Sequence, residues 1–286
     1  MSLFETCARL AAYLTCIGLA LELSHRFYWK LNSRVTQLQI STSWRSILGI
    51  TIATLPMGTA VVITATFVTV LDNQSLLTLG LRYDGDSMVR VAYGAGIALG
   101  CVTLAFLTGL LLGHIDVKPS KMSDDCVACL PLFLGGLIDF MSAAIFEEVI
   151  FRGYVFYILL ESAGLMPAVV VSSAIFSLAH LLKHRNTPVF FTINAFIFGL
   201  ILALCRYHTG TLWLPIGLHF GWNVVSGPIF GLPYSGRSYE RGVVVSDVSG
   251  PLWLTGGSYS LDAGALGTIA LAVAAVGLLT VAPMPW

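Results

Sequence analysis

Charge is the scarcest property of this chain. Asp, Glu, Lys and Arg together make up only 10% of its 286 residues, whereas a soluble domain carries about 25%. Hydrophobic residues make up 56%, and the mean hydropathy is +0.84. These values exclude an ordinary soluble domain and indicate an integral membrane protein, with the lipid bilayer as its surroundings.

The chain also lacks an excess of either charge sign. Fifteen basic and fifteen acidic residues cancel. It therefore has no overall basic field of the kind that attracts nucleic acid or acidic partners. We expect no nucleic-acid partner.

The sequence contains one CxxC motif and lacks a second one that could complete a metal site. Six cysteines are present, and most of them lie in apolar segments, where we interpret them as small packing residues. Cys126 and Cys129 form a lone CxxC motif without the βαβ context of a thioredoxin-like site, which disfavours redox or metal use. We expect no metal or redox site at this pair.

Long apolar runs are abundant. A spanning helix needs roughly 20 mainly apolar residues, and about eight segments fit this template. The expected fold is all-α, a polytopic transmembrane helix bundle of about eight helices. We interpret the first helix as retained, because no small-residue cleavage site clearly follows it. The predicted spans are 7–23, 46–71, 91–113, 132–161, 165–182, 188–206, 212–231 and 263–283.

These spans suggest four regions. We assign residues 1–130 to N-terminal transmembrane helices, 131–231 to the helix bundle that carries the chemistry, 232–262 to a polar Gly/Ser-rich loop, and 263–286 to a C-terminal transmembrane helix. The loop is too polar to span, so it either lies at the membrane interface or folds over the site.

The fourth predicted helix is unusually long. Thirty residues would run about 45 Å, well beyond a hydrocarbon core of about 30 Å. Either Gly135–Gly136 breaks this helix or its end projects.

The basic residues predict an orientation. The loops after the first, third, fifth and seventh helices hold ten Lys and Arg residues, against four on the opposite side. The positive-inside rule then places the first set in the cytoplasm and both termini outside. We expect a multi-pass protein of the cell inner membrane. The ten residues are Arg26, Lys30, Arg34, Arg45, Lys118, Lys121, Lys183, Arg185, Arg237 and Arg241.

One charged stretch interrupts the apolar background. Glu147, Glu148 and Arg152 lie within six positions of the fourth predicted helix, and intramembrane charges are costly enough to be functional or tightly paired. Glu148 and Arg152 are spaced i, i+4, which predicts an ion pair. Glu147 points about 100° away around the helix, where its i+4 neighbour is Phe151. A carboxylate without a local cation suits a general base or acid. The alternative is a structural Glu–Arg clamp beside a polar residue that faces a cavity.

Polar residues on three later helices are further candidates. His180 lies late in the fifth helix, and Asn194 is a polar residue in the apolar sixth span, which we place near the site. His219 and Asn223 share one face of the seventh helix at i, i+4. The alternatives are an interfacial histidine for His180 and interhelical hydrogen bonding for the later pair.

Depth along the helices tests whether these residues meet. At 1.5 Å per residue, Glu147 and His180 both lie about 21–23 Å from the outer ends of their helices. His219 lies only about 10 Å deep and Asn223 about 16 Å. This count places His219 and Asn223 one or two turns too shallow, a gap that helix tilt, a misplaced helix start or long side chains would have to close.

Three ordered motifs carry a family resemblance. EExxxR at 147–152, FxxxH at 176–180 and HxxxN at 219–223 resemble the signature motifs of the CPBP family. These are intramembrane glutamic endopeptidases related to the CAAX prenyl protease type 2, with bacterial members linked to bacteriocin immunity or to processing of C-terminal sorting signals. The resemblance covers about residues 130–227.

The resemblance implies a membrane-embedded glutamic-type protease without metal or cofactor. The resemblance also implies a membrane-anchored or lipidated protein or peptide as substrate. The depth of Glu147 and His180, together with the predicted orientation, places the active site nearer the cytoplasmic face. Each oxyanion donor of such a site contributes about 3–4 kcal/mol. The implied roles are water activation by Glu147 and His180, support of the geometry by Glu148 and Arg152, and hydrogen bonding of the oxyanion by His219 and Asn223.

Motifs of other protease classes are absent from the sequence. It contains no Gly-x-Ser-x-Gly elbow and no His-Glu-x-x-His zinc helix, although Glu and His are zinc ligands in principle. Two other functions stay open. A transporter or proton-coupled carrier would explain charges within spans, but no internal repeat supports it. A catalytically silent binding protein would use the same cavity to hold a partner helix.

Overall fold

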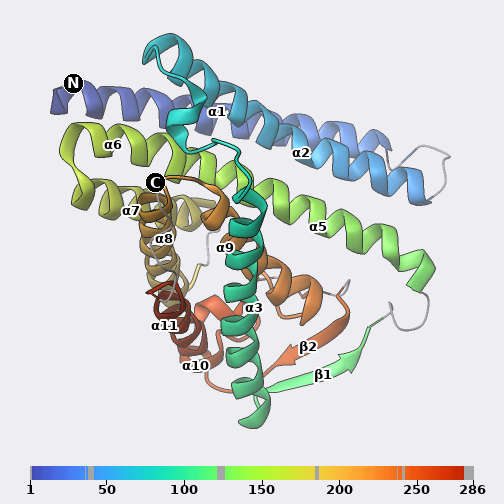
Figure 1. Ribbon diagram of the computed structural model, residues 1–286. Coiled ribbons are helices and arrows are strands. Elements are labelled where there is room, and N and C mark those ends of the chain that lie inside the picture. The colour runs from blue at the N-terminus through green and yellow to red at the C-terminus, as the bar shows by residue number, and fades with distance from the viewer. Residues whose placement is uncertain are drawn as a thin grey trace.

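Helices dominate the protein (Figure 1). The computed structural model describes residues 2–35, 37, 42–120, 126–183, 187–236, 238–239 and 242–279. The helices are α1 (Leu3–Val35), α2 (Thr42–Thr66), α3 (Ser87–Leu111), α5 (Cys126–Glu148), α6 (Phe156–Ala163), α7 (Leu165–Lys183), α8 (Val189–Thr209), α9 (Trp213–Val224), α10 (Leu252–Thr255) and α11 (Ala265–Leu279). Short helical turns follow at Phe67–Leu71, Leu76–Leu79, Val149–Val155, Val225–Ile229 and Leu261–Ala263.

The all-α membrane architecture is confirmed. Five described helices are long and apolar enough to cross a membrane: Leu3–Val35, Thr54–Leu71, Ser87–Leu111, Leu165–Leu182 and Val189–Thr209. The other predicted spans are helical too, as α5 with α6, α9 and α11. Residues 280–283 of the last predicted span lie outside the described residues.

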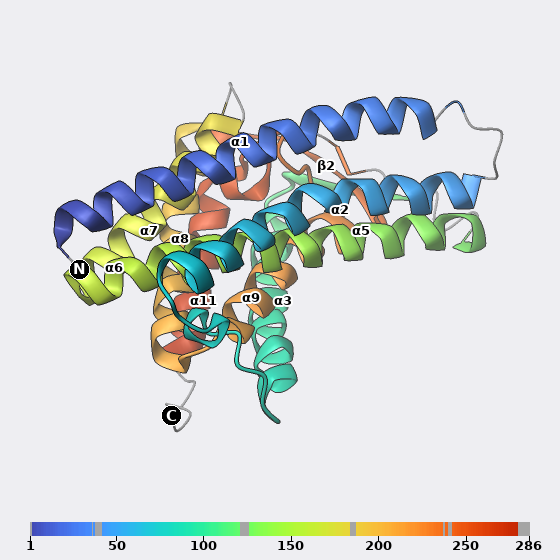
Figure 2. The ribbon, with the colours of Figure 1, turned by 90° about the horizontal axis from the view of Figure 1, so that it is seen from above.

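Two sets of helices cross each other (Figures 1 and 2). One set contains α1, α2 and α5, with α1 packed on α2 and α2 on α5. The other contains α3, α8 and α11, which run down the view of Figure 1 while the first set runs across it. The short α9 packs against both α3 and α5, so it joins the two sets.

The fourth predicted helix is continuous. α5 passes through Gly135–Gly136 without a break, and a π-helical turn over Val149–Val155 carries it into α6. Of the two alternatives, a break at Gly135–Gly136 is therefore excluded, and the far end of α5 projects beside that of α2 (Figure 2). A Cβ on Gly136 would lie 2.7 Å from the Tyr239 hydroxyl, so this glycine allows a close approach by the polar segment.

A two-stranded ribbon holds that polar segment in place. β1 (Ile115–Pro119) pairs antiparallel with β2 (Val244–Val248), with Ile115 opposite Val248. Lys118 on β1 forms an ion pair with Asp247 on β2. We predicted no strand from the sequence, because each strand is only five residues long and its partner is distant in the chain.

Small residues bring α3 and α9 into backbone contact. A Cβ on Gly94 would lie 2.5 Å from the Leu214 carbonyl oxygen, and a Cβ on Gly217 would lie 2.1 Å from the Val91 carbonyl oxygen. Close approach through small residues is a general mode of helix packing in membranes. It fixes α9, and therefore the side chains that α9 carries.

Some residues used for the orientation and the CxxC predictions lie outside the part of the chain that the structure describes. Lys121, Arg185, Arg237 and Arg241, on which the orientation partly rests, lie outside the described residues, as do the side chains of Arg45, Cys126, Cys129 and Lys183. Among the cysteines that are described, Cys7, Cys16, Cys101 and Cys205 are free thiols.

The α3–α9 contact yields a paired test. Gly94→Ala forces a methyl group against the α9 backbone, whereas Gly96→Ala, two residues along α3, meets nothing within 4 Å. Overpacking typically costs about 1–3 kcal/mol. We expect Gly94→Ala to lower the unfolding free energy in detergent micelles by about that amount, with Gly96→Ala close to wild type. Equal stabilities of the two variants would contradict the close contact.

Candidate active site

The centre of the candidate site is a buried charge network. Glu148 and Arg152 are both 0% exposed, and Arg152 Nη1 donates to Glu148 Oε1 over 3.0 Å. His219 Nδ1, from α9, donates to the same oxygen over 2.8 Å. Arg152 also lies 4.1 Å from the centre of the Phe176 ring, a cation–π contact. The predicted Glu148–Arg152 ion pair is confirmed, and it extends to a third partner.

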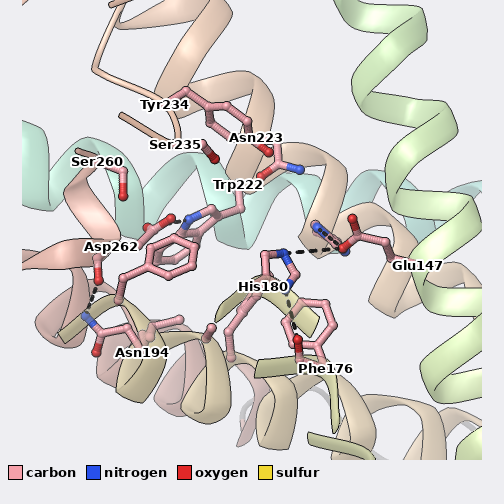
Figure 3. Close-up of a pocket in the computed structure, with 15 residues that line it drawn as sticks. Glu147, Phe176, His180, Asn194, Trp222, Asn223, Tyr234, Ser235, Ser260 and Asp262 are labelled. Carbon is pink, nitrogen blue, oxygen red and sulfur yellow. Dashed lines mark hydrogen bonds and ion pairs between the residues drawn. The ribbon is translucent and has the colours of Figure 1, made fainter. Parts of the chain in front are cut away.

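Glu147 faces two imidazole rings (Figure 3). Its Oε2 lies 3.7 Å from His180 Nε2 and 3.8 Å from His219 Nε2. These distances exceed those of direct hydrogen bonds and suit a water molecule shared between the groups. Adjacent residues on a helix point about 100° apart, so one helix presents Glu147 to the pocket and Glu148 to the buried network. A π-helical turn at Val149–Val155 begins just after Glu148. Such turns are frequent at functional sites.

The ring of His180 is oriented by its own helix. Its Nδ1 lies 2.9 Å from the Phe176 carbonyl oxygen. Since a carbonyl only accepts, Nδ1 carries the proton, and Nε2 of the neutral ring is left as an acceptor that faces Glu147. The FxxxH spacing therefore has a geometric reason, because the first residue of the motif fixes the tautomer of the last.

The site residues of α9 lie in the same pocket. His219 and Asn223 are 5% and 6% exposed, and both line one pocket together with Glu147 and His180. The predicted shallow placement of His219 and Asn223 is wrong. Counting depth assumed parallel helices that begin at one surface, whereas α9 bridges helices that cross (Figure 1).

Residues 130–225 match the family model described as Rce1-like, type II CAAX prenyl endopeptidase Rce1-like. This segment, about a third of the chain, is similar to that family. No curated protein and no solved structure matches the chain. The match confirms the resemblance of the three motifs, and it supports an integral membrane protein of a protease family.

All six predicted site residues lie within the Rce1-like segment, and the structure brings them together. Asn194, also in this segment, lines the pocket, but its side chain is occupied by structural bonds. Its Nδ2 donates to the carbonyl oxygens of Asp262 and Gly264 over 2.7 and 3.1 Å, and its Oδ1 accepts from Thr268 over 2.8 Å. Asn194 thus positions the polar segment.

Sequence reasoning missed the part of the pocket that lies beyond the Rce1-like segment. Four residues of the polar 232–262 region also line the pocket (Figure 3): Tyr234, Ser235, Ser260 and Asp262. Their only signal was the polarity of a segment too hydrophilic to span. The polar segment therefore folds over the site.

Glu and His are zinc ligands in principle, so these residue types also suit a metal centre. In the described part of the chain, no group of three or more His, Cys, Asp and Glu side chains is arranged to hold a metal ion. The two glutamates of the Rce1-like segment differ in surroundings, since Glu148 is fully buried in its ion pair and Glu147 opens to the pocket.

The buried network makes a stability prediction. Arg152→Met leaves the Glu148 carboxylate buried with one fewer partner, and breaking a buried pair costs about 3–5 kcal/mol. Adding Glu148→Gln removes the stranded charge and should recover part of this loss. The control is Arg26→Met on α1, which breaks an exposed i, i+4 pair with Glu22 and should cost under about 1 kcal/mol. Unfolding free energies in micelles measure all three, and equal costs for Arg152→Met and Arg26→Met would contradict the network.

Proposed function

We propose that this protein is an intramembrane endopeptidase that hydrolyses a peptide bond of a membrane-associated protein or peptide. The observation that carries the proposal is the Glu147 carboxylate facing His180 and His219 at 3.7 and 3.8 Å inside a pocket. The Rce1-like match of residues 130–225 supports it.

The first step is attack by water. A water molecule between Glu147 Oε2 and His180 Nε2 is held by two acceptors, and both can take a proton from it. Its oxygen attacks the scissile carbonyl carbon as one proton passes to Glu147. His180 Nε2 can accept a proton because the Nδ1 proton is donated to the Phe176 carbonyl. Glu147 and His180 are therefore the proposed catalytic residues.

The tetrahedral oxyanion needs hydrogen-bond donors. The Asn223 amide supplies one from the pocket wall. His219 supplies a second through Nε2–H in its doubly protonated form, in which Nδ1 donates to the Glu148 carboxylate. Collapse of the intermediate breaks the C–N bond, and the proton held by Glu147 moves to the leaving nitrogen. The products are a carboxylate and an amine.

The substrate class follows the family. Type II CAAX prenyl endopeptidases are named for lipidated C-terminal motifs, and a membrane-anchored or lipidated substrate suits a site inside a helix bundle. Aromatic side chains, Phe176, Phe191 and Phe198, line the pocket beside the polar groups. We place the protein in the inner membrane with its site nearer the cytoplasmic face, following the distribution of basic residues.

Loss of the general base is the first functional test. Glu147→Gln keeps the size of the side chain but removes its basicity, so we expect hydrolysis to fall by about 10²–10⁴-fold. Proteomics of membrane-protein termini, with wild type and variant expressed in turn, identifies the cleaved substrate. A reconstituted assay on that substrate then gives the rates.

The control for this test is Glu161→Gln, which changes an exposed glutamate of α6 outside the catalytic pocket. It should cleave at the wild-type rate. Unchanged termini in the Glu147→Gln cells, or a rate that a metal chelator abolishes in wild type, would sink the glutamate mechanism. Solute flux across sealed vesicles without cleavage would favour the carrier alternative.

Asn223 tests the oxyanion interaction separately. Asn223→Ala removes a donor that acts mainly in the transition state, so kcat should fall by about 10²–10³-fold with little change in KM. Asn223→Asp, which places a carboxylate against the oxyanion, should be no better than alanine. A rise in KM with kcat preserved would instead make Asn223 a ground-state binding residue.

A further inference from the structure

A carboxylate outside the family segment faces the candidate active site. Asp262 sits on the short helical turn Leu261–Ala263 and lines the pocket. In Figure 3 it lies on the side of the pocket opposite Glu147. Two hydrogen bonds from Asn194 to the carbonyl oxygens of Asp262 and Gly264 hold this turn against α8, so the position of the carboxylate is fixed by the fold.

The Asp262 carboxylate is held by a neutral donor. Trp222 Nε1 donates to Asp262 Oδ1 over 2.8 Å, and no described Lys or Arg forms an ion pair with it. Burial raises the pKa of the Asp262 carboxyl to about 6, although the Trp222 bond and nearby His219 oppose that rise. A desolvated carboxylate of this kind gains more from a cation than one in water.

Ser260 provides an independent sign of a ligand. Its side chain is 4% exposed and lines the same pocket, and its Oγ has no hydrogen-bond partner among the described residues. A buried hydroxyl without a hydrogen-bond partner destabilises a protein. A ligand that brings a polar group to this end of the pocket would satisfy it.

The walls beside Asp262 are aromatic. The Trp222 and Phe198 rings lie 5.2 Å apart, and Phe191 packs 5.1 Å from Tyr259. Such walls accept an aliphatic stem, and their ring faces attract a cation. A pocket with aromatic sides and a carboxylate at one end matches the side chain of Lys or Arg.

We propose that Asp262 is a specificity-determining residue that binds a Lys or Arg side chain of the substrate near the scissile bond, with the Ser260 hydroxyl at the same end of the pocket. The identification of the bound side chain as part of a substrate rests on the proposed function, whereas the cation site itself does not. Its test therefore has a part that needs no catalysis.

The first part measures binding of n-butylguanidinium to the protein in nanodiscs by ligand-observed NMR, with n-pentanol as the neutral probe. Hydrogen bonds to a charged group predict that Asp262→Asn weakens guanidinium binding about 10–100-fold and leaves pentanol binding within about twofold. Asp247→Asn, which changes an exposed aspartate of β2, should bind as wild type does. Equal guanidinium binding by wild type and Asp262→Asn overturns the proposal. Guanidinium binding that is lost in Glu147→Gln but retained in Asp262→Asn overturns it as well.

The second part measures cleavage of reporter peptides in which Lys or Met is scanned across the residues flanking the cleaved bond. Wild type should prefer Lys at one position, and the Lys-to-Met ratio of kcat/KM there should fall to about one in Asp262→Asn. A ratio near one at every position in wild type overturns the proposal. If neither peptide is cleaved, the proposed function fails while the NMR result still decides the cation site.

Discussion

Burying charge inside an apolar bundle is the constraint on which this structure depends. An ion taken out of water costs several kcal/mol even after the protein relaxes, so each buried charge needs a partner in good geometry. Glu148 Oε1 meets this need by accepting from both Arg152 and His219. One oxygen atom thereby ties the long α5–α6 helix to α9, and helices that carry different motifs become a single site.

The surrounding packing makes that tie rigid. Gly94 and Gly217 let α3 and α9 touch along their backbones, which fixes the depth and rotation of His219. With His219 held by Glu148 on one ring nitrogen, its other nitrogen faces Glu147. The two adjacent glutamates thus have separate surroundings. One belongs to the buried framework, and the other opens to the pocket where the proposed chemistry takes place.

Local spacing predicted more of the site than long-range reasoning did. The Glu148–Arg152 pair follows from i, i+4 geometry on one helix, and the helical segments follow from their apolar length. The depth of His219 could not be counted, because helices that cross do not share a starting plane. Asp262 had no sequence signal beyond the polarity of its segment, since an aspartate at the end of such a segment reaches the pocket only through the distant bonds of Asn194 and Trp222.

The most direct test of the central claim follows the oxygen of the attacking water. A single turnover in H₂¹⁸O, with enzyme in excess over substrate, should place one ¹⁸O atom in the new carboxylate of the product and none in Glu147. An unlabelled first-turnover product, with ¹⁸O in the Glu147 side chain, would instead show that the glutamate attacks the peptide itself and would contradict a water activated by Glu147 and His180.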